Sequence, residues 1–204
     1  MKIAQKYSHL NGEEYLIVHH KNLYKEIKKV ISSIKKSDLI HKKSKDITKI
    51  GREMIDQKHL NKLFKDHFSK FNWKESRYQY YITLNRDLME KSILMPYEDQ
   101  KEFLTKESDS EPIRSYKQTD FVKDKIAVEV QFGKYSFVAF DLFVKHMLFY
   151  SGGVINVGIE ILPTKNMQMQ MDAGVAYFEG EVYNVMRQGR NSPPVPLLIL
   201  GIEP

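Results

Sequence analysis

Three oxygen-bearing side chains in the second half of the chain could bind a metal ion. Asp120 precedes a short polar turn, and Glu129 and Gln131 follow in a segment of alternating apolar residues. Side chains in a strand repeat with period two, so Glu129 and Gln131 share one face. If residues 117–121 and 126–132 pair as strands, Asp120 lies near that face. Two carboxylates and an amide oxygen would then converge.

This cluster has two interpretations. Like charges held together in a partly buried site repel each other, and Mg²⁺ would relieve the repulsion by binding Asp120, Glu129 and a backbone carbonyl such as that of Val130. The ion would polarise a phosphodiester and stabilise charge on the leaving oxygen. The other interpretation is an edge strand whose carboxylates form salt bridges with Lys123 or Lys125. The residues alone leave both open.

Hydrophobic periodicity predicts the elements that must position these residues. Stripes with helical spacing predict helices, and alternating or continuous apolar runs predict strands. The expected helices cover 21–35, 57–71, 87–107 with a break at Pro96, 136–150 and 176–188. The expected strands cover 77–84, 117–121, 126–132, 154–162 and 195–202. The helix between strands 126–132 and 154–162 completes a βαβ-like unit, so we expect an α/β fold with a central mixed sheet flanked by helices.

The helix at 136–150 should begin with Ser136 as its N-cap and end at Gly152. Its expected inward stripe contains five apolar residues: Phe137, Phe140, Val144, Met147 and Leu148. The aromatic residues of this helix are spread too widely for a single buried stripe. We therefore expect apolar surface to remain for an interface, although core packing explains most of it.

Length and composition favour one domain in an ordinary cellular compartment. The 204 residues suit a single domain, 1–204, with a helical, lysine-rich region at 21–71 and a catalytic and recognition core at 115–202. No apolar run approaches the roughly 20 residues that span a bilayer, and no signal peptide is recognisable. We expect a cytoplasmic protein without a membrane partner. The absence of Cys excludes disulfides and thiolate zinc sites.

The whole chain has a net charge of +6, and its lysines are concentrated in the first third. The lysine-rich segments 28–36 and 41–49 could attract a polyanion such as nucleic acid. A solvated helix face and a loop are the alternative. The seven His are expected to be structural or surface residues, and the Met-rich run at 167–171 a flexible loop.

Longer motifs carry a resemblance to a known enzyme family. They follow one another along most of the chain: YSHLNGEEY, WKESR, QTDFVKD, EVQFGKYSFVA, DLFVKHM, EILP, YNVMRQGR and GIEP. With these motifs, the chain resembles type II restriction endonucleases of the BstYI, BglII and BamHI group in the PD-(D/E)XK nuclease superfamily. It is most similar to the BstYI branch.

The resemblance implies a restriction-endonuclease-like fold and a type II endonuclease that uses Mg²⁺. Such an enzyme is a homodimer that cuts double-stranded DNA at a GATC-centred palindrome, RGATCY, after the first base, and leaves four-base 5′ overhangs. It also implies a cognate DNA methyltransferase in the host. Two alternatives are a sequence-specific DNA-binding protein with a disabled nuclease core and a repair-type nuclease of the same fold.

The same resemblance assigns catalytic roles. Asp120 and Glu129 would hold the metal, and Gln131 stands where most of the superfamily has Lys. A Gln cannot act as a general base, so it can only orient water or the ligands of the metal. Glu75, in WKESR, is a further candidate catalytic residue. A surface salt bridge with Lys74 or Arg77 is its alternative.

Base recognition is expected from two segments. Lys134 resembles the position that faces the outer base pair, where Lys can donate to guanine O6 or N7; a phosphate contact is the alternative. Ala173 and Gly174 belong to the second segment, and Ser136 is a further candidate DNA contact. Ala173 replaces a Ser of the BstYI branch, and its side chain cannot form hydrogen bonds. Preference for GGATCC or AGATCT is therefore the alternative to RGATCY.

Overall fold

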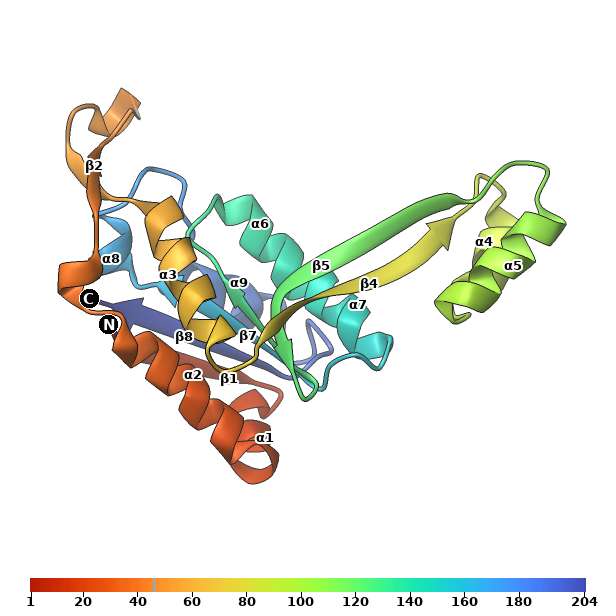
Figure 1. Ribbon diagram of the computed structural model, residues 1–204, viewed down its shortest axis with the longest axis horizontal. Helices are drawn as coiled ribbons and strands as arrows, with labels where there is room; N and C mark the ends of the chain where they lie inside the picture. The colour runs from red at the N-terminus through yellow and green to blue at the C-terminus, as the bar shows by residue number, and fades with distance from the viewer. Residues whose placement is uncertain (46) are drawn as a thin grey trace. The chain divides into compact units, whose positions relative to one another are not determined.

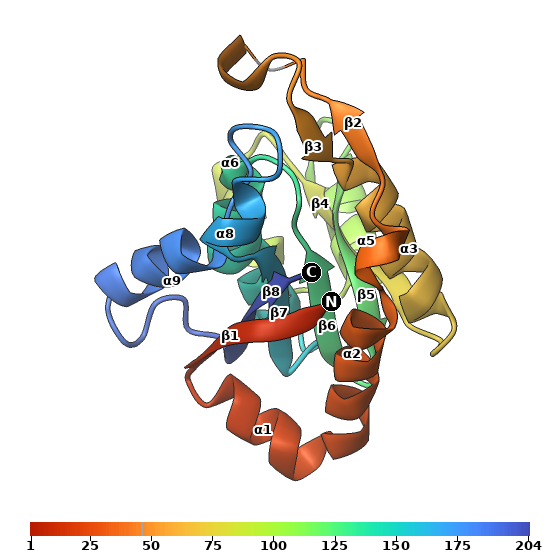
Figure 2. The same cartoon turned by 90° about the vertical axis from the view of Figure 1, so that its left-hand side faces the viewer.

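The computed structural model describes residues 1–45 and 47–204, so Asp46, in the predicted lysine-rich loop, lies outside the described residues. The chain divides into two compact units. One contains residues 1–76 and 119–204, and the other contains residues 77–118. The first unit contains every candidate site residue, and its sheet and helices can be followed in Figures 1 and 2.

A mixed sheet of order β1-β8-β7-β6-β5-β4 organises the fold. Its strands are β1 (Lys2–His9), β4 (Lys74–Ile82), β5 (Ile113–Lys123), β6 (Ile126–Val130), β7 (Val157–Pro163) and β8 (Leu197–Glu203). β6, β7 and β8 are parallel, whereas β1 is antiparallel to β8 and β5 to β6. The predicted mixed sheet and βαβ unit are confirmed, and the two strands of that unit, β6 and β7, are parallel. β1 was not predicted from the hydrophobic pattern, because it is a largely exposed edge strand with few apolar residues.

Helices cover both faces of this sheet (Figure 2). In the first unit they are α1 (Gly12–His19), α2 (Lys21–Ser33), α3 (Gln57–Ser69), α6 (Tyr135–Phe140), α7 (His146–Ser151), α8 (Lys165–Gln168) and α9 (Phe178–Arg187). A π-helical turn, Asp141–Lys145, joins α6 to α7. Two short 3₁₀ turns cover Lys36–Asp38 and Ile47–Lys49, and a small hairpin pairs β2 (His41–Lys43) with β3 (Glu53–Ile55).

The core has two parts, one on each face of the sheet. The predicted stripes of α2 and α3 are confirmed, since Ile27, Phe64 and Phe68 are fully buried with Val128 of β6. On the other face, α6 and α9 pack against β8 through a second cluster: Val138, Leu142, Val185, Leu197 and Ile199. The sheet is therefore apolar on both faces, and a charge placed inside it needs a specific partner.

The helical run at 135–151 differs from its predicted orientation. Lys134 is the N-cap, and Ser136 lies in the first turn. Most of the expected inward stripe is exposed: Phe137 by 58%, Phe140 by 38%, Val144 by 44% and Met147 by 40%. The buried face instead combines Val138, Leu142 and Phe149 with three polar residues, Asp141, Lys145 and His146. The prediction was wrong because the polar face has buried partners on the sheet.

The Met-rich run at 167–171 is also more ordered than predicted. It starts inside α8, for which Thr164 is the N-cap, with its side chain accepting from the Met167 N–H. Met167 and Met171 are fully buried in the larger core cluster. The flexible-loop prediction was wrong because the alternate Met residues provide a buried face.

Residues 77–118 form the second unit, with α4 (Arg86–Ser92), α5 (Tyr97–Glu107) and parts of β4 and β5. The predicted helix break is confirmed, since Pro96 is the N-cap of α5. The side chain of Gln100 accepts a hydrogen bond from the Tyr81 N–H at 2.7 Å. The rings of Tyr81 and Tyr97 stack with centroids 5.0 Å apart.

Across residues 1–45 and 47–204, every helix is too short or too polar to cross a bilayer.

Close packing of α1 on β8 gives a test of the fold. A Cβ at Gly12 would lie 2.3 Å from the carbonyl oxygen of Leu197, so Gly12→Ala must displace backbone. We expect urea denaturation to show a loss of about 2–3 kcal/mol in the free energy of unfolding. Gly133→Ala is the matched control, because its nearest neighbour would be 3.8 Å away. Equal stability of the two variants would contradict the packing described for Gly12.

Candidate active site

A tight hairpin positions Asp120 beside β6. Asp124 and Lys125 both have positive φ, 47° and 65°, and join β5 to β6 as a two-residue turn. The regular pairing extends from this turn to Phe121. Beyond it, the Asp120 carboxylate accepts from the Val130 N–H at 3.4 Å. Asp120 thus lies where the two strands begin to separate.

Glu129 is buried in an interior strand, with 1% of its surface exposed. Its Oε1 accepts a short hydrogen bond from the Thr119 hydroxyl and lies 2.8 Å from Nζ of Lys145. The salt bridge considered with Lys123 is wrong, because Lys123 pairs with Glu26 at 2.8 Å. The cation that neutralises Glu129 comes from the helical run after β6.

Lys145 also contacts Asp141, which in turn contacts Gln131. Its Nζ also lies 2.6 Å from Oδ1 of Asp141, and Oδ2 of Asp141 accepts a short hydrogen bond from Nε2 of Gln131. Lys145 and Asp141 were missed by sequence reasoning. The sequence does contain one sign of this pair. In DLFVKHM, Asp141 and Lys145 are four positions apart, so they lie on one face of a helix, next to Leu142.

These carboxylates raise one another's affinity for protons. Burial, followed by the charge of Asp120, raises the pKa of Glu129 to about 8, although Lys145 opposes the shift. Burial also raises the pKa of Asp141 above its ordinary value. Burial lowers the pKa of Lys145, but the charges of Glu129 and Asp141 raise it by more, so that the ammonium stays protonated. The site holds more carboxylates than its single ammonium can neutralise.

A second buried pair lies on the neighbouring strand. Glu160 of β7 is in register with Glu129, and its Oε1 lies 2.9 Å from Nε2 of His146. Burial lowers the pKa of His146 to about 3 and raises that of Glu160 well above its ordinary value, so both shifts favour the uncharged forms. Oε2 of Glu160 has no hydrogen-bond partner among the described residues. Room for the His146 ring comes from Gly158, where a Cβ would lie 2.5 Å from Nδ1.

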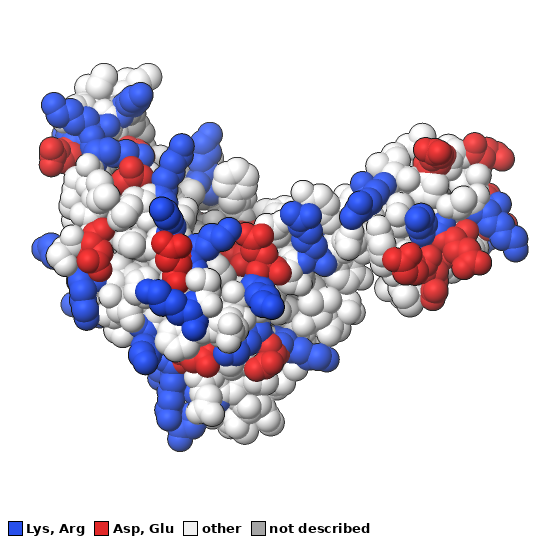
Figure 3. Space-filling model, in the orientation of Figure 1, with Lys and Arg blue, Asp and Glu red and all other residues white. Residues whose placement is uncertain are grey.

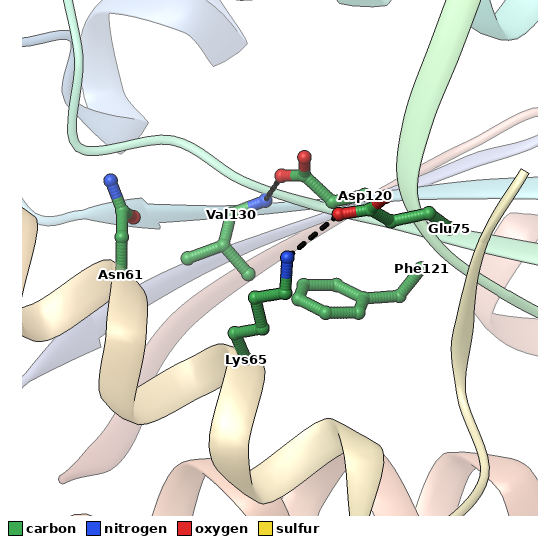
Figure 4. Close-up of a pocket in the computed structure, with 6 residues that line it drawn as sticks. All are labelled: Asn61, Lys65, Glu75, Asp120, Phe121 and Val130. Carbon is green, nitrogen blue, oxygen red and sulfur yellow. Dashed lines mark hydrogen bonds and ion pairs between the residues drawn. The ribbon is translucent and has the colours of Figure 1, made fainter.

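An open pocket of about 190 Å³ lies beside Asp120 (Figure 4). Its lining residues come from α3 and the strands: Asn61, Lys65, Glu75, Asp120, Phe121 and Val130. Glu75 pairs with Lys65 at 2.8 Å on the exposed side of this pocket. Lys65 was not among the partners considered for Glu75, because the two residues lie on different elements ten positions apart.

The oxygen donors fit a divalent cation. Asp120 and Glu129 are hard ligands; burial and then repulsion from Asp120 raise the pKa of Glu129, and a cation would relieve that repulsion. Within the described residues, no three His, Asp or Glu side chains are arranged to hold a metal ion. This is compatible with Mg²⁺, which usually takes one or two carboxylates and completes its coordination with phosphate oxygens and water.

The two predicted recognition segments lie side by side. Lys134 forms a bridge with Val175, and the Tyr135 N–H donates to the Gly174 carbonyl at 2.8 Å. Lys134, Ser136, Ala173 and Gly174 are all exposed. Positions 40 residues apart in sequence therefore form one surface.

The lysine-rich hairpin contacts the chain just before this surface. The Ser44 hydroxyl donates to Asp172 at 2.8 Å, and Nζ of Lys49 donates to the Met171 carbonyl at 2.6 Å. Figure 3 shows Lys and Arg side chains gathered over β2 and β3, at the upper left. A basic surface thus adjoins the predicted recognition residues.

Comparison with protein families shows which family the chain belongs to. The model of the family "Restriction endonuclease BglII/BglIII" matches residues 4–202. The chain belongs to this family. It is a type II site-specific deoxyribonuclease, and restriction endonucleases generally use divalent metal ions.

Solved structures of BglII share the fold of this BglII-family endonuclease. BglII complexed with a DNA 16-mer matches 98% of this chain and 76% of its own, with a TM-score of 0.64 and 21% sequence identity. Free BglII matches 100% of this chain and 80% of its own, with a TM-score of 0.60 and 19% identity. Comparison with curated proteins gives no match. The predicted restriction-endonuclease fold is confirmed.

Burial of Glu129 in this BglII-family enzyme predicts a pH dependence of stability. With a folded pKa of about 8 against an ordinary 4.5, the stabilising proton is fully present below pH 4.5 and is lost as the pH rises to 8. In EDTA, Glu129→Gln should therefore gain stability relative to wild type, by about 3 kcal/mol, between pH 5 and pH 8. Urea denaturation at both pH values measures the change. Parallel pH profiles for the two proteins would contradict the prediction.

Proposed function

We propose that this BglII-family endonuclease hydrolyses double-stranded DNA at a GATC-centred palindrome with Mg²⁺ as its cofactor. The proposed site is RGATCY, cut after the first base to leave four-base 5′ overhangs. The observation that supports phosphodiester hydrolysis is the Asp120 carboxylate, which lines an open pocket and lies close enough to Glu129 to raise its pKa. The adjoining basic surface supports a polyanionic substrate.

Asp120 and Glu129 would hold the metal, together with the Val130 carbonyl. When bound, Mg²⁺ supplies a positive charge that polarises the phosphodiester and stabilises charge on the leaving oxygen. Gln131 would orient water or the ligands of the metal, because an amide cannot accept a proton as a general base. Glu75 lines the same pocket, and we propose that it contributes to catalysis there.

Sequence recognition would come from the surface formed by Lys134, Ser136, Ala173 and Gly174. Lys134 can donate to guanine O6 or N7 in the major groove. Ala173 contributes no hydrogen bond through its side chain, which leaves Lys134 as the main polar group for the outer base pair. The proximity of the two segments supports a joint role.

A palindromic substrate calls for a two-fold symmetric dimer. The helical run at 135–151 presents an exposed stripe of Phe137, Phe140, Val144 and Met147. On α9, Met186 is also exposed. We propose that these faces support homodimer formation, since exposed apolar patches favour association.

Other parts of the proposal follow from the resemblance to the BstYI branch of the PD-(D/E)XK superfamily. The chain would act as one endonuclease domain, with its catalytic and recognition core at 115–202. A cognate methyltransferase would protect host DNA.

Cleavage of unmethylated plasmid DNA with Mg²⁺ tests the activity and the metal ligands. We expect discrete fragments whose sequenced ends give RGATCY and the position of the cut. Asp120→Asn and Glu129→Gln should lower cleavage by about 10³-fold or more, while metal-free binding to the site is largely retained. Asp124→Asn, on the exposed turn of the same hairpin, is the matched control and should cut normally.

Several results would contradict parts of this proposal. Binding without cleavage would indicate a disabled nuclease core, and cleavage without a fixed sequence would indicate a repair-type nuclease. Ends that all read GGATCC or AGATCT would replace RGATCY. Near-normal cutting by Asp120→Asn would overturn the metal assignment.

A charge introduced into the exposed apolar stripe should weaken the dimer. Met147→Glu is expected to weaken the dimer by about tenfold or more, because it places a carboxylate in an apolar interface. Sedimentation velocity over a concentration series measures this. Val18→Glu, at another exposed apolar position on α1, should leave the dimer intact. An unchanged dimer in Met147→Glu would place the interface elsewhere.

A further inference from the structure

The orientation of the Gln131 amide is determined by its neighbour. Oδ1 of Asp141 faces the Lys145 ammonium at 2.6 Å, and Oδ2 accepts the hydrogen bond from Nε2 of Gln131, so the amide NH₂ of Gln131 faces Asp141. The carbonyl oxygen of the same amide is therefore directed away from Asp141. Gln131 consequently presents an acceptor on the side opposite Asp141.

The orientation of Asp141 depends in turn on Lys145. Nζ of Lys145 contacts Oδ1 of Asp141 at 2.6 Å and Oε1 of Glu129 at 2.8 Å. Only 10% of the Lys145 side chain is exposed, and the two carboxylates are more deeply buried. A buried ammonium is stable only when it is paired, so the three groups hold one another in a fixed arrangement.

The backbone contributes to this arrangement. Asp141 and Lys145 are the first and last residues of the π-helical turn, and both point to the buried side of the run. π-Helical turns are rare and often occur at functional sites. The turn brings a carboxylate and an ammonium together against β6, four positions apart in sequence.

We propose that Asp141 and Lys145 are positioning residues of the nuclease site, a role that rests on the proposed function. Lys145 holds Glu129 in place for the cation. Asp141 turns the Gln131 amide so that its carbonyl oxygen, and not its NH₂, is the group offered to water or to the ligands of the metal. Neither residue needs to touch the substrate.

This arrangement predicts that the hydrogen-bond donor and acceptor at positions 131 and 141 can be exchanged by a pair of substitutions. In Asp141→Asn, the Asn oxygen must accept from Lys145, which leaves the Asn NH₂ facing position 131. Gln131 then has to reverse its amide and present NH₂ to the site. In Gln131→Glu, two carboxylates face each other without a donor. The double variant Gln131→Glu/Asp141→Asn restores the hydrogen bond, keeps the net charge and again presents an oxygen.

A double-mutant cycle tests the proposal with nearly isosteric variants. The measurements are single-turnover cleavage at saturating enzyme with Mg²⁺, metal-free DNA affinity by fluorescence anisotropy, and the melting temperature in EDTA. Each single variant should cut about 10- to 100-fold more slowly than wild type, and the double variant at least about tenfold faster than either. DNA affinity should change by less than about threefold, since no contact to DNA is altered.

The melting temperatures test the coupling of positions 131 and 141 even if the protein does not cleave DNA. The double variant should melt at a higher temperature than either single variant. If wild type fails to cut DNA, the proposed function fails, and the melting temperatures alone decide whether positions 131 and 141 are coupled. If the single effects simply add, on rate and on melting temperature alike, the positioning role of Asp141 is overturned.

Lys145 is tested separately. Lys145→Met should also slow cleavage by about 10- to 100-fold without a comparable change in metal-free DNA affinity, and Lys145→Arg should recover part of the rate. Wild-type cleavage by Lys145→Met would overturn the role of Lys145. Should Lys145→Met not fold, Lys145→Arg alone decides. A rate for the arginine variant equal to wild type or partly reduced supports the role, and a complete loss overturns it.

Discussion

The carboxylate of Glu129 lies inside the sheet, and much of the surrounding structure is arranged to offset its charge. A carboxylate removed from water needs hydrogen-bond donors and a cation. Thr119 supplies a donor from the adjacent strand, and Lys145 supplies the cation. Because Lys145 belongs to the helical run after β6, that run must turn a polar edge toward the sheet. Phe137 and Phe140 are then left on the outer side.

The same constraint extends to the next strand. Parallel in-register pairing brings Glu160 beside Glu129, which would add another buried negative charge. Burial raises the pKa of Glu160 and lowers that of His146, its hydrogen-bonding partner, so both shifts favour the uncharged forms. Gly158, on the same strand, provides the space for the imidazole. Three polar residues of one helical run, Asp141, Lys145 and His146, thus serve two neighbouring strands.

Local patterns in the sequence predicted most of the scaffold. The stripe of α2, the break at Pro96 and the strands and helix of the βαβ unit were all predicted, because each depends on periodicity or backbone chemistry within a few residues. The inward face of residues 135–151 was not. The prediction took the most apolar stripe as the buried face. The face that is buried instead carries the partners of Glu129 on β6 and Glu160 on β7.

The candidate site follows the same division. Their spacing on one hairpin made Asp120, Glu129 and Gln131 candidates, and the resemblance to a known family assigned their roles. Lys145 and Asp141 could not be singled out, since their importance comes from contacts across 16 and 10 positions with strand residues. Charged residues on a helix are usually assigned to solvent. Only the three-dimensional structure shows that these two are buried.

The two-residue turn at Asp124 and Lys125 has a consequence for how such sites can change. It fixes the register of β5 against β6, so the eight residues between Asp120 and Glu129 set a fixed spacing. One inserted residue would move every later side chain of β6 to the opposite face. Glu129 would then point toward α2 and α3, and Val128 toward Lys145. Loops elsewhere in the chain can vary in length, whereas this turn cannot lengthen by one residue without exchanging the two faces of the sheet.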